Sequence, residues 1–133
     1  AGLNDPATYP LLANHFINGN NRYWTYEAIR NLPIPDLASC VSQAWERSKF
    51  GDEYESKSMA RIAAEYGHLD ALDDLIGMLN EESENNRHSA SEARATLLRI
   101  LDFRGSNDEL VEWYEANKAR LVFDPAKKKY VIQ

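Results

Sequence analysis

Histidine and carboxylate side chains are the groups in this 133-residue chain that could do chemistry. His88 and Glu92 are four residues apart, so on a helix they would share one face and could bind a metal ion together with a third ligand. His15 and His68 stand outside any His-Glu-x-x-His or Cys-x-x-Cys frame. A simpler explanation of His88 and Glu92 is that both lie on the solvent-exposed polar face of the helix. We therefore predict no metal site, and a metal-binding or small-ligand-binding helical domain is an alternative.

The usual motifs of nucleophilic and phosphate-binding sites are missing from the sequence. It contains no Gly-x-Ser-x-Gly, no Walker loop, no Gly-x-Gly-x-x-Gly and no pair of cysteines. The single cysteine, Cys40, falls on an apolar helical stripe, where we expect it to be buried. We predict a protein that is not an enzyme and uses no cofactor.

Negative charge gathers in the middle of the chain. Residues 51–84 contain ten acidic and two basic residues, whereas the whole chain has a net charge of −6. Asp70, Asp73 and Asp74 crowd the first turns of a predicted helix, where the helix dipole favours carboxylates. They could form a face for a basic protein partner, or simply a solvated surface. The wider acidic set adds Asp52, Glu53, Glu55, Glu81, Glu82 and Glu84.

The same charge balance excludes other partners. A pI near 5.0 argues against nucleic acid and against an anionic membrane, since both are bound through clustered lysine and arginine. No apolar run approaches the ~20 residues of a membrane span. We expect a soluble protein, either cytoplasmic or exported with its signal peptide removed.

Three large rings lie within four positions, at Tyr23, Trp24 and Tyr26. One helix cannot turn all three inward, so we expect one ring to face solvent, a neighbouring chain or a ligand. Tyr23 and Trp24 are the candidates for use in an interface.

Apolar residues at helical spacing predict the secondary structure. Gly67 is expected to end one helix in a left-handed conformation, and Leu121-Val-Phe and Tyr130-Val-Ile flank a possible small β-hairpin. The predicted helices cover residues 22–32, 35–49, 54–66, 69–79, 89–104 and 107–121. The stripes expected to face inward include Cys40, Val41, Ala44, Trp45, Ser48, Leu69, Leu72, Leu75, Ile76, Leu79, Leu110, Trp113 and Tyr114.

These helices pair into three hairpins, over residues 22–49, 54–80 and 89–121. Their second helices start near Asp36, Asp70 and Asp108, at offsets of 34 and 38 residues. Such a period is typical of stacked helix pairs. We predict an all-α, single-domain chain, a short right-handed α-solenoid over residues 1–133. Residues 1–21 would form an irregular N-terminal cap and residues 122–133 a C-terminal cap.

The segment from Ala60 to Leu79 resembles a HEAT-like repeat, with Gly67 ending the first helix and an aspartate opening the second. It is more weakly similar to the middle of an ankyrin repeat. The ending Glu112-Trp-Tyr-Glu-Ala-Asn-Lys118, followed by Leu121-Val-Phe-Asp-Pro, resembles the tail of some bacterial HEAT-repeat proteins. The resemblance brings no catalytic motif and implies a binding scaffold.

Taken together, these features predict a non-enzymatic protein–protein interaction scaffold that presents an acidic face or groove. Its binding residues would be Asp70, Asp73, Asp74, Tyr23 and Trp24. An immunity protein that neutralises a basic toxin is the second hypothesis, since small size, acidity and the lack of catalytic residues also fit it.

Overall fold

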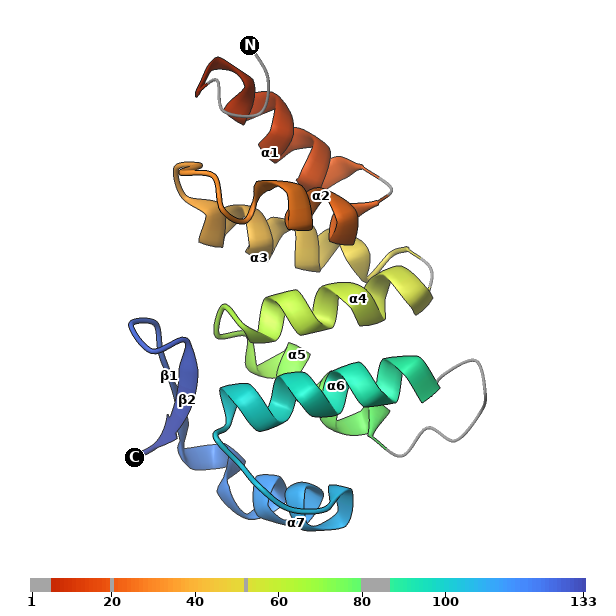
Figure 1. Cartoon of the computed structure of the whole chain (residues 1–133), viewed down its shortest axis with the longest axis vertical. Helices are drawn as coiled ribbons and strands as arrows, with labels where there is room; N and C mark the ends of the chain where they lie inside the picture. The colour runs from red at the N-terminus through yellow and green to blue at the C-terminus, as the bar shows by residue number, and fades with distance from the viewer. Residues whose placement is uncertain (1–5, 20, 52, 80–86) are drawn as a thin grey trace. The chain divides into compact units, whose positions relative to one another are not determined.

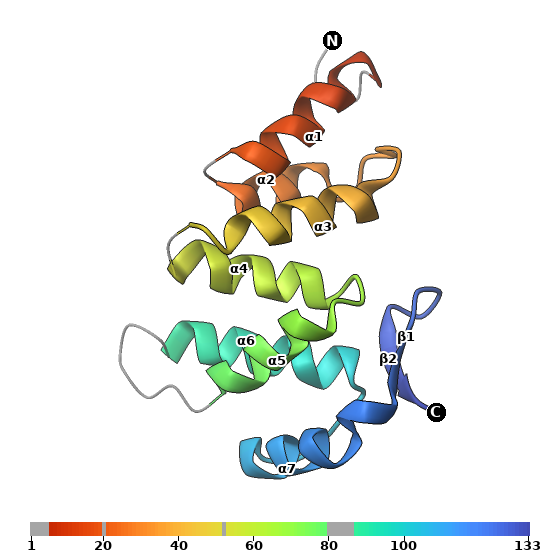
Figure 2. The same ribbon diagram turned by 180° about the vertical axis from the view of Figure 1, so that it is seen from behind.

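The computed structural model describes residues 6–19, 21–51, 53–79 and 87–133, without the side chains of 6, 53, 54 and 87–89. Within them the chain forms seven α-helices and a C-terminal hairpin of two antiparallel strands (Figures 1 and 2). This confirms the predicted mostly helical class with its small hairpin. The elements are η1 (Pro6–Thr8), α1 (Tyr9–Asn18), α2 (Arg22–Ile29), α3 (Leu37–Ser48), α4 (Glu53–Ala64), α5 (Leu69–Met78), α6 (Arg87–Ile100), α7 (Asn107–Asn117), η2 (Lys118–Arg120), β1 (Leu121–Asp124) and β2 (Lys129–Ile132).

The chain divides into two compact units, Ala1–Ile62 and Ala63–Gln133. In the first unit α1 packs against α2 and α3. In the second, α5 packs against α6, and β2 lies beside α6. Each unit has its own buried apolar side chains. None of the helices in the described residues is long and apolar enough to cross a membrane.

The first unit is built around α3. Cys40, Val41, Ala44, Trp45 and Ser48 are all buried, as the apolar stripe predicted. Burial raises the pKa of the Cys40 thiol, so the thiol stays protonated. The cysteine is therefore a core residue of this unit.

Helix α1 is more regular than the irregular cap expected over residues 1–21. Pro10 falls in its first turn, where proline costs no hydrogen bond because the first backbone N–H groups of a helix have no partner. Tyr9 and Phe16 are buried on its inner side, and the Phe16 ring lies 5.8 Å from that of Tyr26 in α2. Thus α1 contributes to the core of the unit.

Gly67 fixes the turn between α4 and α5. Its φ of +97° is the predicted left-handed conformation, and a Cβ atom there would lie 2.8 Å from the ring of Phe123. The glycine therefore serves both the turn and the close packing of β1.

Helix α5 shows one difference from its predicted stripe. Leu72, Leu75 and Ile76 are buried, but Leu69 is 47% exposed. Leu69 is the first residue of the helix, and helical side chains tilt toward the N-terminus. Its side chain therefore extends past the buried part of α5, and the prediction that it faces inward was wrong.

Helix α7 begins with a complete capping box at Ser106 and Glu109. Leu110 and Tyr114 are buried as predicted, whereas Trp113 is half-buried and its ring lies 5.5 Å from the ring of Phe103.

A hydrogen-bond network connects the start of α7 to α6 and to the end of α5. The Arg94 guanidinium donates to Asn107 Oδ1 at 2.7 Å, and Asn107 Nδ2 donates to the carbonyl of Leu79 at 3.2 Å.

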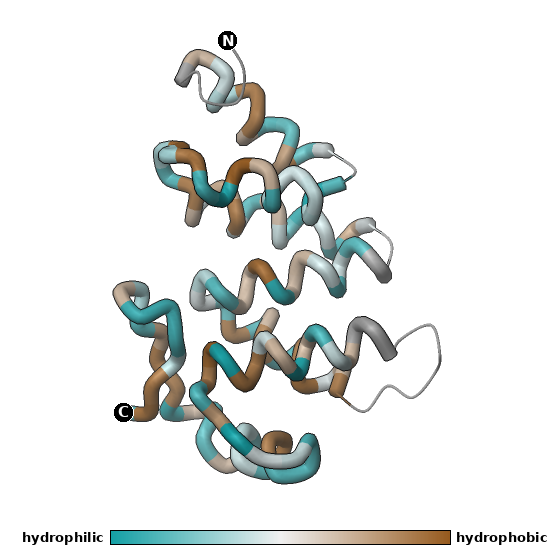
Figure 3. The backbone as a smooth tube through the Cα atoms, viewed as in Figure 1, coloured by the Kyte–Doolittle hydropathy of each residue, from teal (hydrophilic) through white to brown (hydrophobic). Residues whose placement is uncertain are grey.

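The two strands pair so that Val122 faces Val131 and Phe123 faces Tyr130. Leu121 and Tyr130 are buried, and the Tyr130 hydroxyl donates to the Ala64 carbonyl at 2.7 Å. Val122 and Val131 are exposed on the opposite side. Figure 3 shows apolar and hydrophilic positions alternating along the helices and the hairpin, as expected where one side of each element is buried.

Candidate functional site

The aromatic residues of α2 separate into an inner and an outer group. Tyr26 is buried with 5% exposure, whereas Trp24 is 66% exposed. The expectation that one of the three rings faces outward is therefore confirmed, and Trp24 is that ring. Tyr23 lies between these extremes.

Two contacts connect the exposed tryptophan to its surroundings, one directly and one through Tyr23. The Tyr23 ring meets Trp24 edge to face, with centroids 5.5 Å apart. The Arg61 guanidinium of α4 lies over the Tyr23 ring, 4.9 Å from its centroid. Edge-to-face rings and cation–π contacts both have a preferred geometry. We call Tyr23, Trp24 and Arg61 the Trp24 cluster, and it presents a large amphipathic ring that is mostly exposed and contacts Tyr23 along one side.

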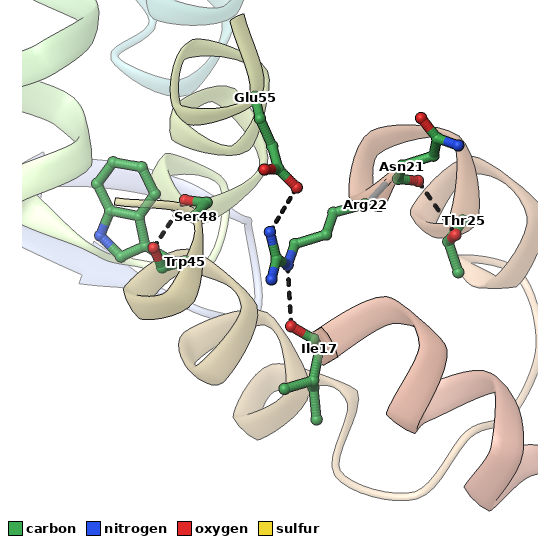
Figure 4. A network of polar contacts seen from close by, with 7 residues as sticks. All are labelled: Ile17, Asn21, Arg22, Thr25, Trp45, Ser48 and Glu55. Carbon is green, nitrogen blue, oxygen red and sulfur yellow. Dashed lines mark hydrogen bonds and ion pairs between the residues drawn. The ribbon is translucent and has the colours of Figure 1, made fainter. Parts of the chain in front are cut away.

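A buried ion pair positions the helix that carries this cluster (Figure 4). Arg22, only 8% exposed, pairs with Glu55 of α4, and its Nε donates to the Ile17 carbonyl at 2.9 Å. A positive charge in the first turn of a helix is disfavoured by the dipole, so these two acceptors compensate for its position and burial. Arg22 thereby joins the end of α1, the start of α2 and the start of α4.

The three aspartates predicted as binding residues all lie exposed on α5. Their spacing places them on one side of the helix, and we call them the α5 acid row. Asp70 accepts a hydrogen bond from the backbone N–H of Ala71 at 3.0 Å. Asp73 accepts one from the hydroxyl of Tyr114 in α7, at 2.5 Å. The structure thus fixes the direction of the Asp73 carboxylate.

Two buried tyrosines stand beneath this row. Burial first, and then the Asp73 hydrogen bond and charge, raise the pKa of Tyr114. Burial also raises the pKa of Tyr130, and the negative charge of Asp70 adds to it. Both phenols therefore stay protonated at neutral pH and act as hydrogen-bond donors.

Part of the predicted set lies outside the described residues. This applies to Asp52, Glu81, Glu82 and Glu84, and to the side chains of Glu53 and His88. The hypothesis of a His88–Glu92 metal pair therefore has no structural counterpart here. Elsewhere in the described part of the chain, no group of three or more histidine, cysteine, aspartate or glutamate side chains could hold a metal ion.

The first unit contains a hollow with an apolar lining. Its volume is about 490 Å³, and it lies at the start of α1 beside the connection from α2 to α3. The lining side chains are almost wholly apolar, with the Tyr9 hydroxyl as the one titratable group. They are Tyr9, Pro10, Ala13, Pro33, Ile34 and Pro35.

Sequence reasoning singled out the α5 acid row and the α2 rings but missed three of the residues that position them. Arg22, Arg61 and Tyr114 act across helices, with partners 33, 38 and 41 positions away. The only sequence signals for these contacts were an arginine in an apolar first turn and a tyrosine on an inward stripe.

Comparison of the chain with family models, curated proteins and solved structures finds no match.

Proposed function

We propose that this protein is a non-enzymatic binding module that recognises a basic protein partner. The observation that supports it best is the exposure of Trp24 in a braced orientation. Tryptophan is prominent among the residues that dominate interface energies, because it buries a large apolar area when a partner covers it.

The bracing matters as much as the exposure. Ordering a mobile side chain at an interface opposes binding, and a ring already fixed by Tyr23 avoids much of that cost. Phe50 provides a contrast within the same unit. It is 93% exposed and has no ring partner in the described part of the chain. We therefore assign the anchor role to Trp24.

The α5 acid row supports the basic character of the partner. Three exposed carboxylates on one helix side create a local negative potential, which favours association with a positive surface and disfavours a negative one. The Tyr114 hydrogen bond holds one carboxylate ready for contact. Each compact unit thus carries one of the two proposed contact surfaces.

A HEAT-like repeat architecture is part of the same proposal. From Glu53 to Arg87 and from Leu69 to Asn107, helix starts recur after 34 and 38 residues. This spacing suits stacked helix pairs, a common scaffold for protein recognition.

The test is capture of partners from native lysate by the immobilised chain and four variants. Trp24→Ala removes the proposed anchor, and Phe50→Ala removes an exposed aromatic outside the cluster. The variant D70N/D73N/D74N removes three negative charges while keeping an acceptor for Tyr114. Its matched control, E46Q/D102N/E112Q, removes three exposed negative charges outside the α5 acid row and outside α2.

We expect a partner that is retained by the native chain and both controls, lost with Trp24→Ala, and weakened with D70N/D73N/D74N. Raising the salt concentration should release it, since surface charges are screened. Equal retention by all five proteins would overturn the proposal. A captured basic toxin would identify the immunity function, and co-expression should then protect cells from that toxin.

A further inference from the structure

The C-terminal hairpin presents an apolar patch on its outer side. Val122 and Val131 face each other across the strands and are 41% and 38% exposed. Ile132, at the end of β2, is 42% exposed but pairs with Leu121, so it lies on the other side of the hairpin, with Tyr130. The buried Leu121 and Tyr130 already attach the hairpin to its unit. The exposed valines are therefore not needed to hold it in place.

Basic residues lie next to this patch along the chain, although the chain as a whole is acidic. Residues 118–129 contain five basic side chains and one acidic one, Asp124, and two of the five, Lys118 and Lys129, pair with Glu115 and Asp102. Lys127 and Lys128 stand exposed in the loop that joins the strands, and within the described residues neither forms an ion pair. We call Val122, Val131, Lys127 and Lys128 the hairpin outer face.

The loop that carries Lys127 and Lys128 has a defined backbone shape. The φ of Lys128 is +54°, the left-handed region in which glycine or asparagine is favoured over lysine. The loop is fixed in this shape, because the Asp124 carboxylate accepts hydrogen bonds from the backbone N–H groups of Ala126 and Lys127. The two lysines therefore stand in a loop of defined backbone shape beside the strands that carry the valines.

We propose that the hairpin outer face binds an extended acidic segment of another protein. Aliphatic side chains of the segment would cover Val122 and Val131, and its carboxylates would reach Lys127 and Lys128. Four strand residues span about 13 Å, which suits a short stretch of apolar residues flanked by acids. This proposal does not depend on the Trp24 cluster or on the α5 acid row.

Other anionic partners fit the geometry less well. A membrane would first meet the charged loop, whereas membrane-inserting hairpins carry apolar residues there. A single nucleic-acid strand would need exposed rings for base stacking, but the Tyr130 ring is buried. Any long polyanion would also approach α7, which carries Asp108, Glu109, Glu112 and Glu115. A short acidic segment bound at the hairpin avoids that repulsion, because salt at physiological concentration screens charges that are more than about 8 Å apart.

The test uses the full chain and a fluorescein-labelled peptide, Glu-Asp-Leu-Val-Leu-Glu-Asp, followed by fluorescence anisotropy. Two control peptides replace either the aliphatic residues with serine or the acids with lysine. The protein variants are K127Q/K128G, in which glycine suits the left-handed position, and R47Q/K49Q, which removes the same charge near the end of α3. Thermal unfolding of each variant shows whether it is folded.

We expect K127Q/K128G to weaken peptide binding about three- to tenfold while its melting temperature is unchanged or higher. R47Q/K49Q should bind the peptide like the native chain, and both control peptides should bind weakly. Equal binding by K127Q/K128G and the native chain would overturn the proposal. So would tighter binding to phosphatidylserine vesicles or to an oligo(dT) strand than to the peptide.

Discussion

Single residues in this protein differ greatly in what their charges contribute. Glu55 and Glu65 both pair with an arginine, but the Arg22–Glu55 side chains are only 9% and 17% exposed, against 56% and 24% for Arg99–Glu65. A buried pair is costly to break because one charge is left without a partner. An exposed pair is screened by water and contributes little.

We therefore expect Glu55→Gln to lower the free energy of unfolding by about 3 kcal/mol, and Glu65→Gln by less than about 1 kcal/mol. Urea unfolding followed by circular dichroism measures both. Replacing the whole pair, as in R22M/E55L, should recover part of the loss. Equal effects of the two single substitutions would show that the Arg22 contact is not desolvated.

The raised pKa of Tyr114 makes a prediction about alkaline pH. The unfolded chain releases the phenolic proton near pH 10, whereas the folded chain retains it. Above about pH 10 the folded state binds more protons, so stability falls as the pH rises. Each such tyrosine contributes a slope of about 1.4 kcal/mol per pH unit.

Tyr130 has the same sign, so the variant Y114F/Y130F should flatten this slope. Urea midpoints at about pH 9 and about pH 11 provide the measurement. The variant should also be less stable at neutral pH, since it loses the hydrogen bonds to Asp73 and Ala64. An unchanged slope above pH 10 would mean that both hydroxyls are accessible to solvent.

At the scale of elements, the two glycines near α5 have opposite roles. Gly67 has φ +97° and lies against the Phe123 ring, whereas Gly77 lies inside α5 with no atom within 4 Å of an added Cβ. Gly67→Ala should destabilise the chain by about 2 kcal/mol, through strain and the displaced ring. Gly77→Ala should stabilise it by up to about 1 kcal/mol, because alanine favours a helix interior.

Thermal unfolding of the two variants tests this contrast, because both replace a glycine by alanine and differ only in position. Melting temperatures that move in opposite directions support the assignment of Gly67 to the turn. A loss of stability in both variants would mean that Gly77 is in contact with another part of the chain.

Sequence patterns predicted the elements well where a local rule acts. The stripe of α3 and the left-handed Gly67 depend on neighbouring residues, and the structure confirms both. Periodicity did not predict the exposure of Leu69 and the partial burial of Trp113. An apolar stripe does not indicate which of its positions a neighbouring element covers. The outward ring at Trp24 was predictable, since three adjacent rings exceed one helix side. The Arg61 contact that braces the cluster depends on tertiary packing and was not.

At the scale of the whole molecule, the excess of negative charge opposes compactness. The chain carries 21 acidic and 15 basic residues, for a net charge of −6. Like charges repel more in the folded chain than in the extended one, and salt screens this repulsion. Exposed ion pairs such as Arg99–Glu65 act in the opposite direction, because salt weakens them. The repulsion involves more charges, so we expect it to dominate.

Raising sodium chloride from about 20 mM to about 300 mM should therefore increase the melting temperature by roughly 3 °C, corresponding to about 1 kcal/mol. D70N/D73N/D74N should show a smaller increase, since it removes three of the clustered charges. E46Q/D102N/E112Q, with the same net charge, should keep more of the salt effect because its acids are dispersed along the chain. If salt lowered the melting temperature instead, ion pairs would outweigh repulsion. Equal increases for D70N/D73N/D74N and E46Q/D102N/E112Q would show that the α5 acid row is not a site of concentrated negative potential, which would also remove the electrostatic reason for expecting a basic partner there.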